Sequence, residues 1–284
     1  MAVTSILDAV RRARERHQAV PLFVCGDMLS AEGVIAASEA TGRPCMLGMW
    51  GGLLERPGGE DLVRWVRSAA ERSDATVSLM LDHGRAVEQC LRALDLGFSD
   101  VMYDGSSLPL EENLANAGRV VEVARAAGVG VEAELGIVGR GSEYHASNNE
   151  GLTDVESAVR FASESGCDVL AVAIGTAHGQ YSAEPRLDLD RLRRIRSRVN
   201  VPLAVHGGSG LSEEQFRSVI EAGVSKINIG TDLYLAARDG MADAARQDEV
   251  RYFDFLQAAR DAFRARAEHY LRLFGGPDAA AGRG

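Results

Sequence analysis

The chain has 284 residues, 46% of them hydrophobic and 25% charged, which is typical of a soluble globular protein with one large core. The formal net charge of −10 argues against a nucleic-acid-binding or membrane-binding surface, because both need a basic face. The sequence contains neither an N-terminal signal run nor an apolar stretch long enough to span a bilayer, so we expect a cytoplasmic protein that acts on a small molecule.

Short β-branched runs alternate with longer amphipathic runs along the chain. In chain order, the predicted strands are 20–24, 44–49, 76–82, 100–104, 130–135, 169–174, 202–206 and 226–229. The helices predicted after them are 30–41, 60–73, 84–96, 110–127, 153–165, 189–198, 212–222 and one that begins near Thr231. A further amphipathic helix over 253–274 closes the chain. Eight strand–helix units in strict alternation predict an α/β fold, a single (β/α)8 TIM barrel over residues 1–284 with an extra C-terminal helix.

Two predicted helix starts have the spacing of a capping box, in which a hydroxyl side chain and a Glu or Gln three residues later cap each other's backbone. These are Thr153 with Glu156, and Ser212 with Gln215. The longest stretch without a predicted element is 136–149, which is rich in Gly, Ser and Asn. A loop of this length inside a compact domain is typical of a lid or a binding loop.

Three of the six histidines lie at or just beyond the ends of predicted strands: His83, His178 and His206. In a barrel of this kind the active site lies at the carboxyl ends of the strands, so we expect the three imidazoles to meet at one mouth. A lone histidine in a loop is more often structural, but three that converge are difficult to explain in that way. Three imidazoles that leave a fourth position open are typical of a catalytic zinc site, and nearby carboxylates can orient them.

Asp82 directly precedes one of these histidines. Neighbouring residues on a regular strand point to opposite faces, so the strand must end or twist for both side chains to enter the site. Asp82 is then interpreted either as a general base beside the metal or as the N-cap of the helix predicted from Gly84. The resemblance described below favours the first interpretation.

Glycine-rich segments follow the last two predicted strands. One is 207–210, with the sequence GGSG, and the other is Gly230–Thr231. Backbone N–H groups in such turns and at helix N-termini bind phosphate, and the loops after strands seven and eight are a frequent phosphate site in barrels. The alternative is that these glycines only make tight turns.

Six segments in order resemble the class II (zinc-dependent) fructose-bisphosphate and tagatose-bisphosphate aldolases. They are LDH at 81–83, DGS at 104–106, EAELG at 132–136, GTAHGQY at 175–181, HGGSG at 206–210 and KIN at 226–228. The resemblance extends over nearly the whole chain, including the closing helix. Several motifs in the family's order are far more specific than any one of them.

The resemblance implies a zinc ion held by His83, His178 and His206. It implies that Asp82 is the acid/base that acts on the substrate hydroxyl beside the cleaved bond. It places Glu134 and Asp104 near the metal, as ligands at an alternative or second metal position. The family often also uses a monovalent cation near the phosphate and assembles as homodimers or homotetramers.

The resemblance also implies a substrate, a ketose phosphate or bisphosphate that is cleaved or formed by retro-aldol or aldol chemistry. The residues expected along its ketose-phosphate half are Gly179, Gly207, Ser209, Asn228 and Thr231. The family places a glutamate on the loop after strand five to protonate the enediolate carbon, and Glu143 is the nearest candidate. No Schiff-base lysine is needed, and the only lysine, Lys226, begins strand eight, at the end of the barrel opposite to the expected site.

Three positions depart from the family pattern. Trp50 stands near the place of a small hydroxyl residue after strand two, Ala183 replaces a lysine near the phosphate, and Val24 replaces an asparagine after strand one. We therefore expect a substrate other than fructose 1,6-bisphosphate. The alternatives are a metal-dependent barrel lyase with a pathway-specific substrate and a catalytically silent homologue that serves as a binding protein.

Overall fold

The computed structural model describes residues 3–144 and 151–276. Its centre is a closed barrel of parallel strands in the order β1, β10, β9, β7, β5, β4, β3, β2. Their bounds are β1 Val20–Val24, β2 Cys45–Trp50, β3 Val77–Gly84, β4 Asp100–Tyr103, β5 Gly130–Leu135, β7 Val169–Val172, β9 Leu203–Val205 and β10 Val224–Ile229. Because β1 pairs with both β2 and β10, the sheet has no open edge. The predicted (β/α)8 barrel is confirmed.

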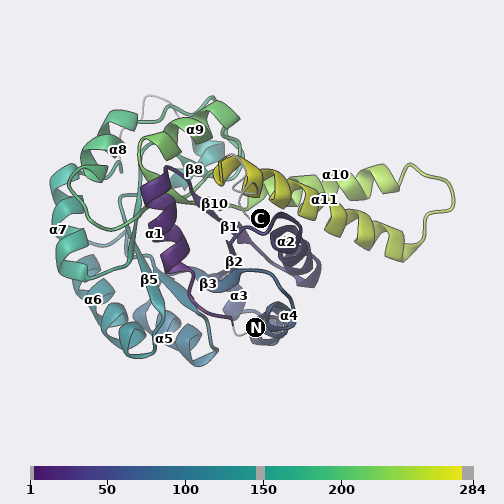
Figure 1. Ribbon diagram of the computed structural model, residues 1–284, viewed down its shortest axis with the longest axis horizontal. Helices are drawn as coiled ribbons and strands as arrows, with labels where there is room; N and C mark the ends of the chain where they lie inside the picture. The colour runs from purple at the N-terminus through teal and green to yellow at the C-terminus, as the bar shows by residue number, and fades with distance from the viewer. Residues whose placement is uncertain (1–2, 145–150, 277–284) are drawn as a thin grey trace, which may run out of the picture.

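Helices surround the barrel, and at least one follows each strand (Figure 1). They are α2 Met28–Thr41, α3 Gly51–Leu54, α4 Gly59–Glu71, α5 Val87–Asp95, α6 Leu110–Ala126, α7 Val155–Ser165, α8 Leu189–Arg196, α9 Glu213–Glu221 and α10 Thr231–Ala244. The predicted closing helix is α11 Tyr252–Phe274. Helix α1, Leu7–Arg16, is not among the predicted helices, because its many charged residues conceal a short apolar face.

The core has two layers because successive strand residues point to opposite faces. The larger layer lies between the strands and the helices, and the smaller one fills the barrel interior. Interior side chains such as Leu22, Met46 and Met80 pack in one cluster with Val10 of α1. This helix therefore closes the amino-terminal end of the barrel.

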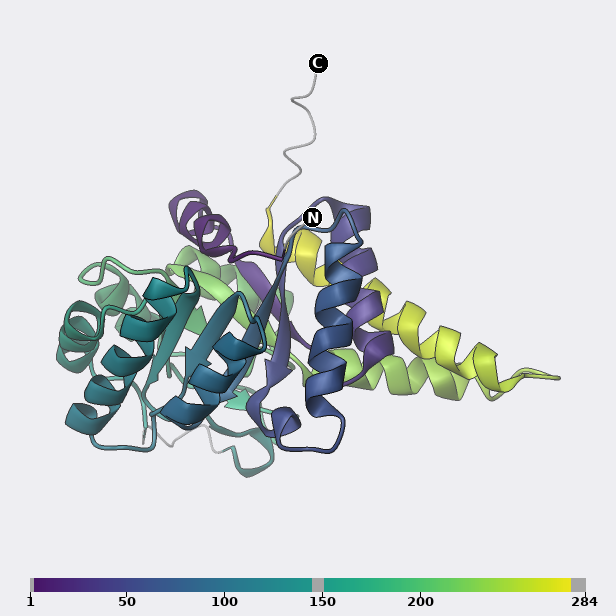
Figure 2. The same ribbon diagram turned by 90° about the horizontal axis from the view of Figure 1, so that it is seen from below.

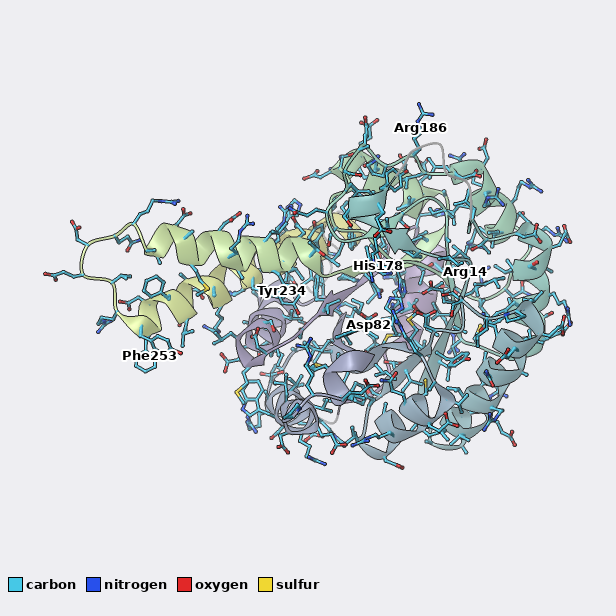
Figure 3. All side chains as sticks on the ribbon, turned by 180° about the vertical axis from the view of Figure 1, so that it is seen from behind. Arg14, Asp82, His178, Arg186, Tyr234 and Phe253 are labelled. Atoms are coloured by element: carbon cyan, nitrogen blue, oxygen red, sulfur yellow. The ribbon has the colours of Figure 1, made fainter. Side chains whose placement is uncertain are left out.

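Helices α10 and α11 form an antiparallel pair that projects from the barrel (Figures 1 and 2). At its base, the carboxylate of Asp232 at the start of α10 accepts hydrogen bonds from Arg266 and, at 2.7 Å, from the hydroxyl of Tyr270 on α11. Tyr252 and Phe253 at the start of α11 are exposed, and Figure 3 shows Phe253 at the far end of the pair.

The structure decides between the two predicted capping boxes. Ser212 and Gln215 form one, with bonds of 3.1 and 2.9 Å. Thr153 does not, because the residue after it, Asp154, is the N-cap of α7. The buried hydroxyl of Thr153 instead donates to the carbonyl of Leu135 and accepts from the amide of Ala173, which ties the start of this segment to the barrel.

The segment after β5 is more ordered than the sequence predicts. Its two-residue strand β6, Gly139–Arg140, pairs with β8, Ala177–His178, and a short helix η1, Gly141–Glu143, follows. The rest of the predicted loop, including His145, lies outside the described residues. No helix among the described residues is both long and apolar enough to cross a membrane.

Candidate active site

The end of β3 brings two adjacent side chains into the barrel mouth. The register of β3 against β4 shifts between Leu81 and Gly84, and His83 adopts a left-handed backbone with φ 54°. This interrupts the alternation of the strand, so Asp82 and His83 both line the same cavity. The alternative role of Asp82 as a helix N-cap is wrong, because α5 begins at Val87 and its N-cap is Ala86.

The three predicted histidines meet at this mouth. The Nε2 of His83 lies 2.9 Å from the Nδ1 of His206, and one ring nitrogen from each of the three lies within 4.8 Å of the others. The ring centroid of His83 is 5.0 Å from that of His178 and 4.7 Å from that of His206. Figure 3 shows His178 and Asp82 near the middle of the barrel.

Carboxylates hold two of these rings from behind. The Nδ1 of His83 bonds Asp104 Oδ2 at 2.8 Å, and the Nε2 of His206 bonds Glu132 Oε1 at 2.7 Å. Each bond occupies one ring nitrogen and leaves the other facing the neighbouring rings. Glu132 is not among the predicted site residues, although its alternation with Glu134 along β5 indicates that both side chains point inward.

Glu134 is the most unusual carboxylate of the site. It is buried, and its Oε2 has no hydrogen-bond partner although it lies 3.7 Å from His83 Nδ1 and 3.6 Å from His206 Nδ1. Burial is the main cause that raises the pKa of Glu134 to about 8, against the opposing charge of His83. An unpaired buried oxygen beside the imidazoles of His83 and His206 fits a site for a divalent cation, and His83, Asp104 and Glu134 form a second possible ligand group.

The imidazoles differ in their affinity for protons. Burial opposes a charge on His83, but the carboxylates of Asp82 and Asp104 outweigh it and raise its pKa to about 9. Burial, and then the charge on His83, lowers the pKa of His178 to about 4. Burial also lowers the pKa of His206 well below its usual value. At neutral pH, therefore, His178 and His206 present neutral rings, and a metal ion competes with one proton on His83.

The cavity above the histidines has a volume of about 580 Å³. All five residues predicted along the ketose-phosphate half line it, namely Gly179, Gly207, Ser209, Asn228 and Thr231. The Oγ of Ser209 accepts hydrogen bonds from the amides of Gly230 and Asp232, at 3.3 and 3.1 Å, and so joins the two glycine-rich loops. At Gly207 the backbone has φ 70° and a Cβ would lie 2.4 Å from the carbonyl oxygen of Ala177, so this loop position requires glycine.

Two of the three departures from the family pattern also line the cavity. They are Val24 and Trp50, whereas Ala183 does not. Trp50 is 42% exposed, and Arg56 lies over its ring at 5.7 Å from the centroid. Arg85 and Arg140, which the sequence analysis did not single out, line the mouth without an ion pair to any described residue.

Glu143 lies apart from the other predicted site residues. It ends η1 as an exposed residue and does not line the cavity. Its neighbour Tyr144 joins this segment to the loop after β8, because its carbonyl accepts from Ser182 and its hydroxyl accepts from the amide of Arg186.

Comparisons with known proteins agree on one family. The family model described as Fructose-bisphosphate aldolase class-II matches residues 4–279. A fructose-bisphosphate aldolase of Geobacillus stearothermophilus is 34% identical over 286 residues, covering 99% of this chain and 100% of the relative. A 6-phospho-5-dehydro-2-deoxy-D-gluconate aldolase of Shouchella clausii is 34% identical, covering 95% of this chain and 94% of the relative. The crystal structure of the YdjI aldolase from Escherichia coli K12 has a TM-score of 0.85 and 32% identity, covering 96% of this chain and 97% of that one. The chain therefore belongs to the class II fructose-bisphosphate aldolase family and is an aldolase, a carbon–carbon lyase.

Proposed function

We propose that this aldolase is zinc-dependent and cleaves or forms a ketose phosphate, giving a dihydroxyacetone-phosphate-like enediolate and an aldehyde. The observation that carries the proposal is the meeting of three imidazole nitrogens and the buried carboxylate of Asp82 at one cavity. The glycine-rich loops that line the same cavity supply the backbone N–H groups expected of a phosphate site.

In this proposal His83, His178 and His206 hold the metal. Three nitrogen ligands with carboxylates behind them suit zinc. Glu134 and Asp104 provide the alternative position, where a second divalent ion would bind, and a monovalent cation would accompany the phosphate. When bound, zinc would polarise the ketone carbonyl and stabilise the negative charge that develops on the ketose fragment.

Asp82 removes the proton from the substrate hydroxyl next to the bond that breaks. Its Oδ1 accepts a hydrogen bond from Asn228 at 2.9 Å, and no other described residue bonds this carboxylate. As the hydroxyl becomes an aldehyde carbonyl, the electrons of the carbon–carbon bond pass to the ketose fragment. We assign the return of a proton to that carbon to Glu143, for which the segment after β5 would have to move toward the cavity.

The residues at the cavity mouth support a substrate other than fructose 1,6-bisphosphate. Trp50 narrows the mouth, which disfavours a long aldehyde half, and the guanidinium groups of Arg85 and Arg140 would bind an anionic group of the substrate. The relatives also differ in substrate, since one is named for a deoxygluconate phosphate. A smaller or differently charged ketose phosphate fits these features, and we propose that the protein acts as a homodimer or homotetramer in the cytoplasm.

The proposal is tested by measuring aldol cleavage of a panel of ketose phosphates, including fructose 1,6-bisphosphate, with the wild type and with Asp82→Asn. We expect one member to be cleaved efficiently and Asp82→Asn to lower its kcat by a factor of about 10²–10⁴, as for loss of a general base, while KM changes little. The exposed Asp74→Asn is the matched control. If the wild type binds zinc but cleaves no member, a pathway-specific substrate is favoured, and if it binds no zinc either, the silent homologue is favoured.

A further inference from the structure

The only lysine of the chain lies in the centre of the barrel. The backbone of Lys226 lies in the first half of β10, but its side chain is fully buried and extends toward the active site. Its Nζ lies 3.0 Å from Glu132 Oε2, donates to Glu132 Oε1 at 3.2 Å and donates to Asn228 Oδ1 at 2.5 Å. The position of Lys226 in the sequence places it at the wrong end of the barrel, but the length of the side chain overcomes that distance.

One branch of these contacts leads to the metal ligands. The Nζ of Lys226 contacts both carboxylate oxygens of Glu132 and so fixes the orientation of this carboxylate. The Oε1 of Glu132, held in this way, lies 2.7 Å from the Nε2 of His206. This contact orients the ring of His206 so that its Nδ1 faces His83.

The other branch leads to Asp82. An ammonium group has only donors, so the side chain of Asn228 must turn its Oδ1 toward Lys226. This orientation points the Nδ2 group of Asn228 at Asp82 Oδ1, where it donates at 2.9 Å. The direction of a single amide therefore follows from the lysine and determines which hydrogen bond the carboxylate receives.

We propose that Lys226 is a positioning residue that sets both the ring orientation of His206 and the orientation of Asp82. The metal branch depends only on the His206 geometry, whereas the base branch rests on the proposed function. A purely structural role makes a different prediction. If Lys226 only balanced the buried charge of Glu132, both residues could be replaced together with little effect on the site.

The test uses Lys226→Met, Glu132→Gln and the double variant, with Met46→Leu as a volume-conserving change elsewhere in the barrel interior. Zinc affinity is measured by chelator competition, stability by thermal unfolding, and kcat and KM at saturating zinc. Lys226→Met leaves Glu132 as an unpaired buried charge, so we expect it to be destabilised. The double variant contains neither charge, so its stability should recover and the comparison does not depend on the single variant folding.

The positioning role predicts that the double variant, although stable, binds zinc about 10- to 100-fold more weakly than wild type, the usual effect of losing an outer-shell partner. At saturating zinc its kcat should remain at least about tenfold low while KM changes less, because Asn228 has lost the donor that orients it. Zinc affinity within twofold of wild type in the double variant would overturn the metal branch without any need for a substrate. A kcat within twofold of wild type at saturating zinc would overturn the base branch.

Discussion

Among the residues at the cavity mouth, Trp50 is best placed to select the substrate. It pairs with Asp82 in the register of β2 against β3, and both residues line the cavity. The ring rests against Gly52, where a Cβ would lie 2.4 Å from it, and Arg56 lies over it. The indole thus has Gly52 and Arg56 as neighbours and forms part of the wall of the cavity.

Replacing Trp50 with alanine should widen the mouth on the aldehyde side. We expect kcat/KM for a longer ketose phosphate to rise relative to that for the preferred one by about 10- to 100-fold, corresponding to the 1–3 kcal/mol that a pocket of altered shape discriminates. The measurement is the ratio of the two kcat/KM values in the variant and the wild type. Trp65→Phe, on α4 and away from the cavity lining, is the control. An unchanged ratio in Trp50→Ala would show that the indole does not select the substrate.

For single residues, the sequence predicts which side chains reach the cavity better than it predicts the hydrogen bonds between them. The three histidines, Asp82 and Glu134 lie at or just beyond the carboxyl ends of predicted strands, and these ends converge in a barrel. The bond from Glu132 to His206 joins residues 74 positions apart and depends on the register of several strands around the barrel. The reach of Lys226 likewise depends on the direction of a long side chain, which strand position does not determine.

Among the elements, β3 shows how an irregular strand builds the site. A non-glycine residue with φ 54° is strained, and such strain is commonly kept where it orients a functional side chain. Because Asp82 and His83 both need to face the site, the sequence predicts a twist at the end of β3. It does not predict that His83 adopts the left-handed conformation. Thr153 shows a similar limit, because two adjacent residues can each cap a helix and tertiary bonds to Leu135 and Ala173 decide between them.

The opposite end of the barrel contains a titrating carboxyl group, Asp100 at the start of β4. Ser5 donates to its Oδ1 at 2.5 Å, while its buried Oδ2 has no hydrogen-bond partner. Burial is the main cause that raises the pKa of Asp100 from 3.8 to about 7, although the neighbouring hydroxyls of Ser5 and Ser78 oppose the shift. Between these two pH values the folded chain binds more protons than the unfolded chain, so this group makes the protein less stable as pH rises.

Asp100→Asn removes that dependence. We expect the free energy of unfolding of the variant, relative to wild type, to increase as pH rises from about 4 to about 7 and to level off above that range. Urea unfolding at several pH values measures the difference, and Asp74→Asn at an exposed site corrects for the change in net charge. A difference independent of pH across this window would show that Asp100 does not titrate as its burial indicates.

In the whole molecule, the apolar packing that stabilises the barrel and the cavity of the active site lie at opposite ends of the barrel axis. Helix α1 and the apolar interior close one end, and the polar cavity occupies the other. This arrangement was predictable because eight alternating units leave few ways to build a sheet without an edge. The projection of α10 and α11 could not be predicted. Their sequences predict two helices, but not that the two helices pack against each other away from the barrel (Figure 2).

The central claim is that His83, His178 and His206 hold a divalent ion that the reaction requires. The most direct test measures the metal content and the aldol-cleavage rate of the purified protein before and after chelation, with His178→Ala in parallel. We predict that chelation abolishes cleavage, that added zinc restores it, and that His178→Ala binds zinc far more weakly than wild type. A protein that cleaves its substrate at the full rate with its metal removed would contradict the claim.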